Sequence, residues 1–213
     1  NGIEDPGFKG EGLQVFDANG NGVGTQWQGS TNKVYPVAEI HTRAFPYYCK
    51  RHKIFFDTGE IPAGGYKVFR VGLLEEKTDK SVAQSTEWSQ THTLLVSPTS
   101  MENEFLQVEF NANGTFNLID KRHDVTYRNL NYYQDRGEHG SYWINKRPMF
   151  DQVHTSLGCQ ARIWAEESGP LQTTLVSEVT MKLPSKGIPL EQRRGDELVD
   201  LVIYTAVTLR VGE

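Results

Sequence analysis

Residues 171–183 read LQTTLVSEVTMKL, a stretch in which apolar and polar side chains alternate. Successive side chains of a β-strand point to opposite faces, so a period of two predicts a strand. Leu175 and Val179 fall on one face, and Glu178 and Lys182 fall on the other. The stretch therefore predicts a long β-strand with one buried face and one face in water.

The same alternation recurs at residues 197–211, where Val199, Leu201 and Leu209 share one face. A polar loop rich in proline and glycine separates the two stretches. Strands of this length are longer than the usual five or six residues. They favour a large sandwich over a small barrel.

An Asn113-Gly114 pair lies between two further alternating runs, residues 104–110 and 115–119, which predicts a β-hairpin. The first hundred residues contain shorter runs separated by Gly, Pro and Asn clusters. These predicted strands are residues 13–16, 23–27, 37–41, 53–56 and 66–71. Together they predict a small β-sandwich.

No stretch keeps apolar residues at helical spacing for more than a turn or two, so the predicted class is all-β. Residues 74–90 are polar and without periodicity, which indicates an irregular segment. A boundary near Ser97-Pro98 divides the chain into a small sandwich, residues 1–97, and a second domain, residues 98–213. The first residue is Asn1 and a strong strand runs almost to the last, so we expect a chain that is cut at both ends and a small sandwich that is incomplete at its N-terminus.

Composition excludes several classes of function. The formal net charge is -5 and the basic residues are scattered, so the chain lacks the basic surface that nucleic acids require. It has no apolar run long enough to cross a bilayer. Cys49 and Cys159 are far apart and have no second cysteine nearby, which indicates free buried thiols.

The candidate metal ligands do not form a recognisable set. The six histidines show no ligand spacing; they are His41, His52, His92, His123, His139 and His154. Residues 17–22 match the opening of a calcium loop, but Gln28 stands where the closing Glu belongs. A Gly- and Asn-rich hairpin turn explains the same residues better.

Residues 132–143 combine carboxylates, a histidine and four aromatic side chains in a glycine-containing loop. Aromatic faces stack on the C–H surfaces of sugars, and carboxylates accept hydroxyl protons, so the composition suits sugar binding. A long connection whose aromatic side chains fill the sandwich would have the same composition. The residues alone leave both interpretations open.

Three motifs, in the same order along the chain, resemble glycoside hydrolase family 38 α-mannosidases. Residues 101–115 (MENEFLQVEFNANGT), closing on residues 119–121, resemble the strand and hairpin that open the family's C-terminal β region. Residues 17–26 resemble a hairpin of the family, and residues 61–66 resemble its V-P-x-x-G-Y turn. The resemblance implies a small β-sandwich followed by the first part of a large supersandwich of the galactose-mutarotase type.

The resemblance also implies a function. Such enzymes hydrolyse terminal α-mannosides by a zinc-dependent retaining mechanism. Their zinc ligands and carboxylate nucleophile lie in an N-terminal barrel, which here would precede residue 1. The expectation is therefore no catalytic residue and no cofactor in this chain, zinc in the full-length parent, and two partners: mannose-containing glycans and the barrel of the same parent chain.

The loop of residues 136–143 resembles the family's G-D-R-S-G-A-Y segment, whose tyrosine reaches the mannose pocket. Tyr142 corresponds to that tyrosine, whereas Glu138 and His139 depart from the family's pattern. The substrate-binding candidates are therefore Tyr142, Glu138, His139 and Trp143.

Two other functions fit parts of the sequence. One is a stand-alone carbohydrate-binding sandwich. The other is an epimerising enzyme that uses Glu138 and His139 as base and acid, although neighbours in a strand point to opposite faces. Open sheet edges near Asn1 and beyond Val211 would further predict self-association.

Overall fold

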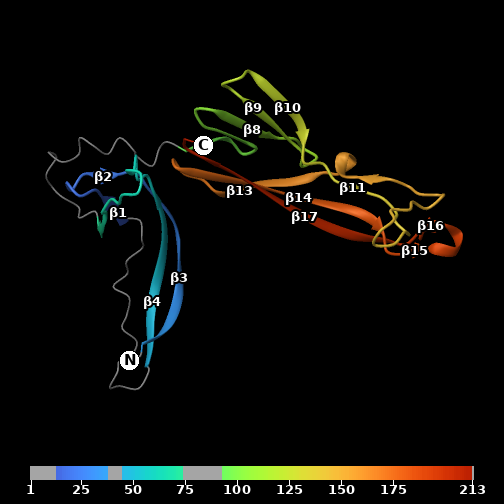
Figure 1. Ribbon diagram of the computed structural model, residues 1–213, viewed down its shortest axis with the longest axis horizontal. Coiled ribbons are helices and arrows are strands. Elements are labelled where there is room, and N and C mark those ends of the chain that lie inside the picture. The colour runs from blue at the N-terminus through green and yellow to red at the C-terminus, as the bar shows by residue number, and fades with distance from the viewer. Residues whose placement is uncertain (1–12, 38–44, 74–92, 213) are drawn as a thin grey trace. The chain divides into compact units, whose positions relative to one another are not determined.

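The computed structural model describes residues 13–37, 45–73 and 93–212 (Figure 1). These residues form β-strands and two 3-10 helices, η1 (Ser156–Gly158) and η2 (Pro189–Glu191). The predicted all-β class is confirmed. Within the described residues, no helix is long and apolar enough to span a membrane. The chain divides into two compact units, Asn1–His92 with Gly169–Leu171, and Thr93–Ser168 with Gln172–Glu213.

The described residues of the first unit form two separate sheets. β1 (Leu13–Phe16) lies between β2 (Gly22–Val23) and β5 (Arg70–Leu73) in an antiparallel sheet. β3 (Thr25–Val37) and β4 (Phe45–Phe56) form a long two-stranded ribbon, with a register shift between Trp27 and Gly29. Val15, in the central strand β1, is completely buried.

The predicted strands of this unit are confirmed to different degrees. Residues 13–16 match β1 and residues 53–56 lie within β4. The strand predicted at residues 23–27 is divided at Gly24 between the end of β2 and the start of β3. The strand predicted at residues 66–71 begins only at Arg70, because backbone pairing with β1 starts there. Most of the strand predicted at residues 37–41, and all of the irregular segment predicted at 74–90, lie outside the described residues.

The second unit contains a five-stranded antiparallel meander. Its strands are β6 (Leu95–Ser97), β7 (Ser100–Glu102), β8 (Leu106–Phe110), β9 (Phe116–Asp120) and β10 (Val125–Leu130). Asn103 makes the turn between β7 and β8, because its Oδ1 accepts the backbone N–H groups of Phe105 and Leu106 at 2.9 and 2.7 Å. Such a side-chain turn replaces ladder hydrogen bonds where the strand ends.

A three-stranded sheet of longer strands completes this unit. Its order is β13 (Ala161–Glu167), β14 (Gln172–Pro184) and β17 (Leu198–Arg210). Two short pairs lie beside it, β11 (Gln134–Asp135) with β12 (His154–Thr155), and β15 (Gly187–Ile188) with β16 (Arg193–Arg194). The hydrophobic core joins the meander to this sheet through Met101, Val108, Phe110, Leu175 and Leu209.

The hairpin predicted at Asn113-Gly114 is confirmed, with β8 paired to β9. Gly114 has φ +83°, while Asn113 does not have a positive φ. The Gly114 N–H donates to the Asn111 carbonyl at 2.9 Å. The connection is therefore a turn over residues 111–114 with glycine in the left-handed position, rather than a two-residue Asn-Gly loop.

Burial differs from the prediction in the first half of β14. From Glu178 onward the expected alternation holds, but Gln172–Ser177 are buried on both faces. Side chains of adjacent strands cover the face that was expected to be in water. Arg210 Nε donates to Gln172 Oε1 at 2.8 Å, and the Thr174 and Thr208 hydroxyls are 2.9 Å apart.

The apolar face predicted for β17 is buried only near its C-terminal end. Leu209 is buried and Val207 packs against the core, whereas Val199 and Leu201 are 48% and 45% exposed. Of the described residues that form the hydrophobic core, none lies in the first half of β17. Cys49 and Cys159 are free thiols, as predicted, but both are only partly buried.

Candidate functional site

The loop that carries the four predicted site residues connects β11 to β12. Its two ends are held together by the pairing of Gln134 with Thr155 and of Asp135 with His154. The buried Ser156 adds two hydrogen bonds to Tyr133, one from the Tyr133 N–H to its hydroxyl at 2.9 Å and one from its own N–H to the Tyr133 carbonyl at 3.0 Å. The loop therefore begins and ends at fixed points.

Tyr142 and Trp143 form the tip of this loop. Ser141 and Ile144 exchange two backbone hydrogen bonds, at 3.0 and 3.1 Å, so the two aromatic residues are the central pair of a tight turn. Tyr142 is 100% exposed and Trp143 is 91% exposed, with ring centroids 6.5 Å apart. The interpretation that these aromatic side chains fill the sandwich is therefore wrong for both residues.

Glu138 holds the base of the tip. Its Oε1 accepts the backbone N–H of Lys146 at 2.7 Å and that of Gly140 at 2.6 Å. These two bonds, that of Lys146 first, hold the pKa of Glu138 below its usual value. Gly140 is required here, because a Cβ atom would lie 1.8 Å from the Ile144 carbonyl oxygen.

His139 follows Glu138 on the same arm of the loop and also bonds to the opposite arm. Its N–H donates to the Lys146 carbonyl at 3.0 Å, and its Nε2 is 3.2 Å from the Arg147 carbonyl oxygen. Glu138 and His139 are thus engaged in the folding of the loop. An exposed carboxylate with a lowered pKa is a weak base, which disfavours the epimerising function.

A partly buried ion cluster at the foot of the loop was not predicted. Arg194 of β16 forms ion pairs with Asp135 and Asp151, and its side chain is 12% exposed. The Gly137 N–H donates to both carboxylate oxygens of Asp151, at 3.0 and 3.1 Å. The Arg194 guanidinium also donates to the Gln152 carbonyl. The cluster fixes both ends of the loop to the β15–β16 hairpin.

A cavity of about 210 Å³ lies between the loop and this hairpin. Glu138 and His139 line it, together with Arg136, Lys186 and Arg193, whereas Tyr142 and Trp143 do not. Ligand pockets generally measure about 300–1,000 Å³, so this cavity is small for a sugar. The structure therefore separates the four predicted residues into a supporting pair and an exposed aromatic pair.

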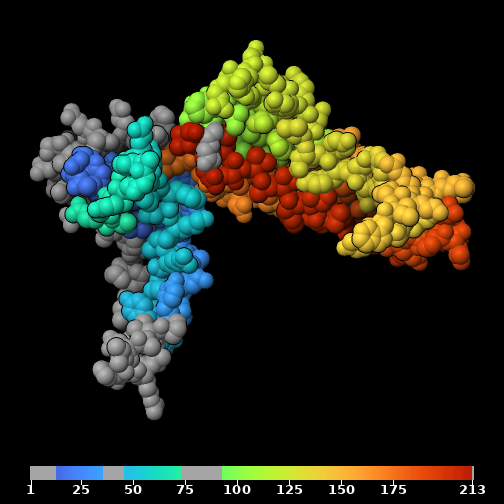
Figure 2. Space-filling model, viewed as in Figure 1, coloured from blue at the N-terminus to red at the C-terminus, as the bar shows by residue number. Residues whose placement is uncertain are grey.

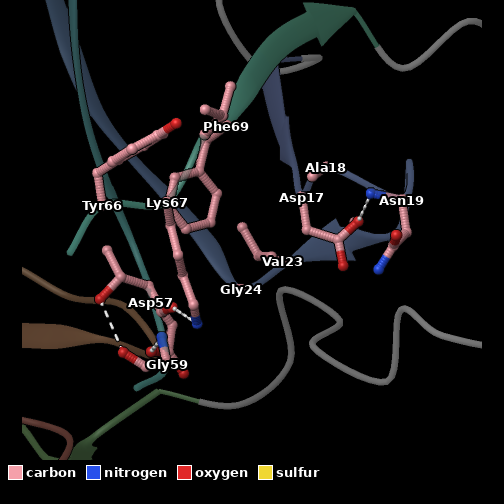
Figure 3. Close-up of a pocket in the computed structure, with 13 residues that line it drawn as sticks. Asp17, Ala18, Asn19, Val23, Gly24, Asp57, Gly59, Tyr66, Lys67 and Phe69 are labelled. Carbon is pink, nitrogen blue, oxygen red and sulfur yellow. Dashed lines mark hydrogen bonds between the residues drawn. The ribbon is translucent and has the colours of Figure 1, made fainter. Parts of the chain in front are cut away.

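A larger cavity, of about 770 Å³, lies in the first unit (Figure 3). Three segments line it: residues 17–24 from the β1–β2 turn and the strand that follows, 57–59 after β4, and 66–69 before β5. Only the first segment was a candidate from the sequence, as a possible calcium loop. For the other two segments, the sequence offered one sign of a site, namely Tyr66 at the end of the stretch that resembles the V-P-x-x-G-Y turn.

Asp17 closes the β1–β2 turn. Its carboxylate accepts the N–H groups of Asn19 and Asn21 at 2.9 and 2.8 Å and the Asn21 side-chain amide at 3.1 Å. The bonds from Asn21 are the main cause that holds the pKa of Asp17 below its usual value. This geometry supports the interpretation of residues 17–22 as a hairpin turn.

The described residues offer no set of zinc ligands. Over residues 13–37, 45–73 and 93–212, no three His, Cys, Asp or Glu side chains lie close enough together to hold a metal ion. His41 and His92 fall outside these ranges. Zinc therefore does not fit the part of the chain that the structure describes.

Comparison with known proteins finds similarity to parts of proteins that are named as hydrolases. No protein-family model matches the chain. A putative mannosylglycerate hydrolase from Halalkalibacterium halodurans is 25% identical over 181 residues, which are 78% of this chain and 19% of that protein.

Two crystal structures then specify the fold. An α-mannosidase from Enterococcus faecalis V583 and a glycosyl hydrolase family 38 protein from Enterococcus faecalis both align with a TM-score of 0.73 at 23% identity. Each alignment covers 95% of this chain, but only 23% and 24% of those chains. The resemblance to family 38 is confirmed, and this chain has the fold of a part of those proteins that is less than a quarter of their length.

Proposed function

We propose that this chain is a non-catalytic β region of an α-mannosidase, which in the full-length protein hydrolyses terminal α-mannosides by a zinc-dependent retaining mechanism. The names of its relatives support a glycosidase parent, since one is a putative hydrolase of mannosylglycerate and another is an α-mannosidase. Zinc and the nucleophile would come from residues outside this chain, as the resemblance to family 38 implies.

The main support for the proposal is the exposed Tyr142–Trp143 tip, which lies on a loop held by hydrogen bonds at its ends and at the base of its tip. The phenol of Tyr142 and the indole of Trp143 are accessible to a sugar, and the backbone that carries them needs little further ordering because Glu138 fixes the turn. The Tyr142 hydroxyl can donate or accept a hydrogen bond, and the rings offer apolar faces. The role of this chain would be to orient the mannoside, and orientation alone has a large effect on rate.

The test is Tyr142→Phe in the full-length enzyme, because this change keeps the ring and removes only the hydroxyl. We expect kcat/KM to fall about tenfold to a hundredfold, if that hydroxyl binds the transition state. Because Tyr142 is fully exposed, Tyr142→Ala should fold as well as Tyr142→Phe. The control is Tyr127→Phe on β10, a 51% exposed tyrosine, which should leave kinetics unchanged. Unchanged kinetics for Tyr142→Phe would remove Tyr142 from the site.

The isolated chain gives a second test. It should not release nitrophenol from an aryl α-mannoside, with or without added zinc, because the catalytic groups would lie elsewhere. Zinc-dependent release would contradict the proposal. Saturable binding of a mannoside with a fluorescence change that disappears in Trp143→Phe would favour the stand-alone carbohydrate-binding module.

A further inference from the structure

The 770 Å³ cavity of the first unit has no part in the proposed function. Its volume lies within the range of about 300–1,000 Å³ that is typical of ligand sites. Its lining comes from three segments that are distant in sequence, all in the first unit. Figure 3 shows Tyr66, Lys67 and Phe69 on one side of it, and Asp17 and Asn19 on the other.

Two aromatic side chains, Tyr66 and Phe69, belong to the apolar part of the lining. Tyr66 is 85% exposed, although tyrosine usually buries much of its ring. A tight turn before it, with Gly64 at φ +68° and the Gly65 N–H bonded to the Pro62 carbonyl at 2.9 Å, determines where it emerges. Phe69 is held by an edge-on contact with Phe56, with ring centroids 5.1 Å apart. These residues place an accessible aromatic surface at the cavity.

The polar groups of the lining are fixed in position but retain hydrogen-bonding capacity. The Asp57 Oδ1 accepts the Gly59 N–H at 2.8 Å, and its second oxygen can still accept. The Lys67 ammonium donates to the Thr58 carbonyl at 3.0 Å and has two further donors. Donors and acceptors placed around an aromatic surface match the alternating hydroxyl and C–H groups of a pyranose.

The charge of the lining favours a neutral ligand. Its titratable side chains with a charge at neutral pH are Asp17, Asp57 and Lys67, which together carry more negative than positive charge. A phosphate or carboxylate would meet two carboxylates and a single ammonium. We propose that this cavity binds a neutral hexopyranose unit of a glycan, in addition to the contact proposed for Tyr142.

The experiment titrates the ¹⁵N-labelled 213-residue chain with methyl α-mannopyranoside and with an α-linked mannobiose, and follows backbone amide shifts. We expect saturable shifts at Gly59, Lys67 and Phe69. Tyr66→Ala should weaken binding about tenfold through the lost stacking surface, whereas Tyr66→Phe should retain most of it. Asp57→Asn keeps an acceptor for the Gly59 N–H and should also weaken binding, which provides a second variant.

The matched control is Tyr127→Ala, since Tyr127 is an exposed tyrosine of the second unit and should bind as the unchanged chain does. No shifts at the cavity amides, or equal affinity in Tyr66→Ala, would overturn the proposal. Tighter binding of mannose 6-phosphate than of the neutral sugar would overturn the assignment to a neutral ligand. Tyr142→Phe should leave this titration unchanged, so this site and the proposed function can fail separately.

Discussion

At the scale of single residues, both the backbone conformation and the neighbouring atoms restrict position 114 to glycine. Its φ of +83° disfavours any side chain, and a Cβ atom would lie 2.4 Å from the Val179 Cγ2. A non-glycine residue in the left-handed region costs about 1–3 kcal/mol, and overpacking of a core adds a similar amount. We expect Gly114→Ala to lower the free energy of unfolding by roughly 2–5 kcal/mol, measured by urea denaturation.

Gly158 provides the control for this prediction. It lies in η1 and does not have a positive φ, and a Cβ atom added there would meet no atom within 4 Å. Gly158→Ala should therefore change stability by less than about 0.5 kcal/mol. If Gly114→Ala and Gly158→Ala changed the free energy of unfolding equally, the φ angle and close contact at Gly114 would not explain why glycine is needed there.

The lowered pKa of Glu138 leads to a prediction about how the stability of the loop tip depends on pH. Because its pKa in the folded chain is lower than the usual 4.5, its bonds to Lys146 and Gly140 stabilise the tip fully above that value. This stabilisation is lost as the pH falls through the lowered pKa. The amide shifts of Gly140 and Lys146 should titrate with a midpoint below 4.5. A midpoint above that value, or no titration in the unchanged chain but one in Glu138→Gln, would contradict this role.

At the scale of elements, the loop of residues 136–153 depends on the β15–β16 hairpin through Arg194. Removing one member of a buried ion pair leaves charge without compensation, which costs about 3–5 kcal/mol. Arg194→Leu would leave Asp151, whose side chain is 10% exposed, without its cation. We expect a loss of roughly that size in unfolding free energy, with faster proteolysis within residues 136–153.

The Lys182–Asp200 ion pair, which joins β14 and β17, is a solvent-exposed control for the Arg194–Asp151 pair. Its atoms are 2.9 Å apart, but the two side chains are 70% and 57% exposed. Solvent screening limits such pairs to about 0–1 kcal/mol. Lys182→Ala should therefore be close to neutral, and an effect as large as that of Arg194→Leu would show that burial does not determine the difference.

The same elements show what the sequence could predict. Alternation located β1, β14, β17 and the β8–β9 hairpin, because the period of two depends only on neighbouring residues. The burial of Gln172 and Thr174 could not be predicted in this way, since it arises from contacts with Arg210 and Thr208 on another strand. The Arg194 cluster was missed for the same reason: it joins residues 59 positions apart, and no local pattern marks them.

The candidate site shows the same difference between what local sequence predicts and what contacts in the folded chain determine. Tyr142 was found through its resemblance to a family segment, and its exposure agrees with a binding role. Glu138 and His139 were chosen for their chemistry, yet their hydrogen bonds to the backbone give them a structural task. Composition identifies which groups can act on a sugar, but only the folded loop determines which of them remain available.

At the scale of the whole molecule, the sheet of long strands in the second unit has a long edge strand. Among the described residues, β17 lies at one edge of the second unit's sheet and pairs with β14 alone, over an unbroken register of residues 198–210. In Figure 2 this strand, in red, forms a long stretch of the visible surface of its unit. Natural edge strands are usually interrupted by bulges, prolines or charges, and β17 has no bulge or proline in this pairing.

This edge makes the last prediction, which is self-association of the chain. The first half of β17 exposes Leu198, Val199, Leu201 and Val202 by 45–49%, and no strand within residues 13–37, 45–73 and 93–212 pairs with its outer side. An uncovered apolar edge recruits a further strand, so sedimentation should show a mass that rises with concentration. Val202→Lys adds a charge to the edge and should shift the chain toward monomer, whereas Val153→Lys, at an equally exposed position outside any strand, should not. A chain that stays monomeric at high concentration would show that this edge is covered, and the edge predicted near Asn1 lies outside the described residues.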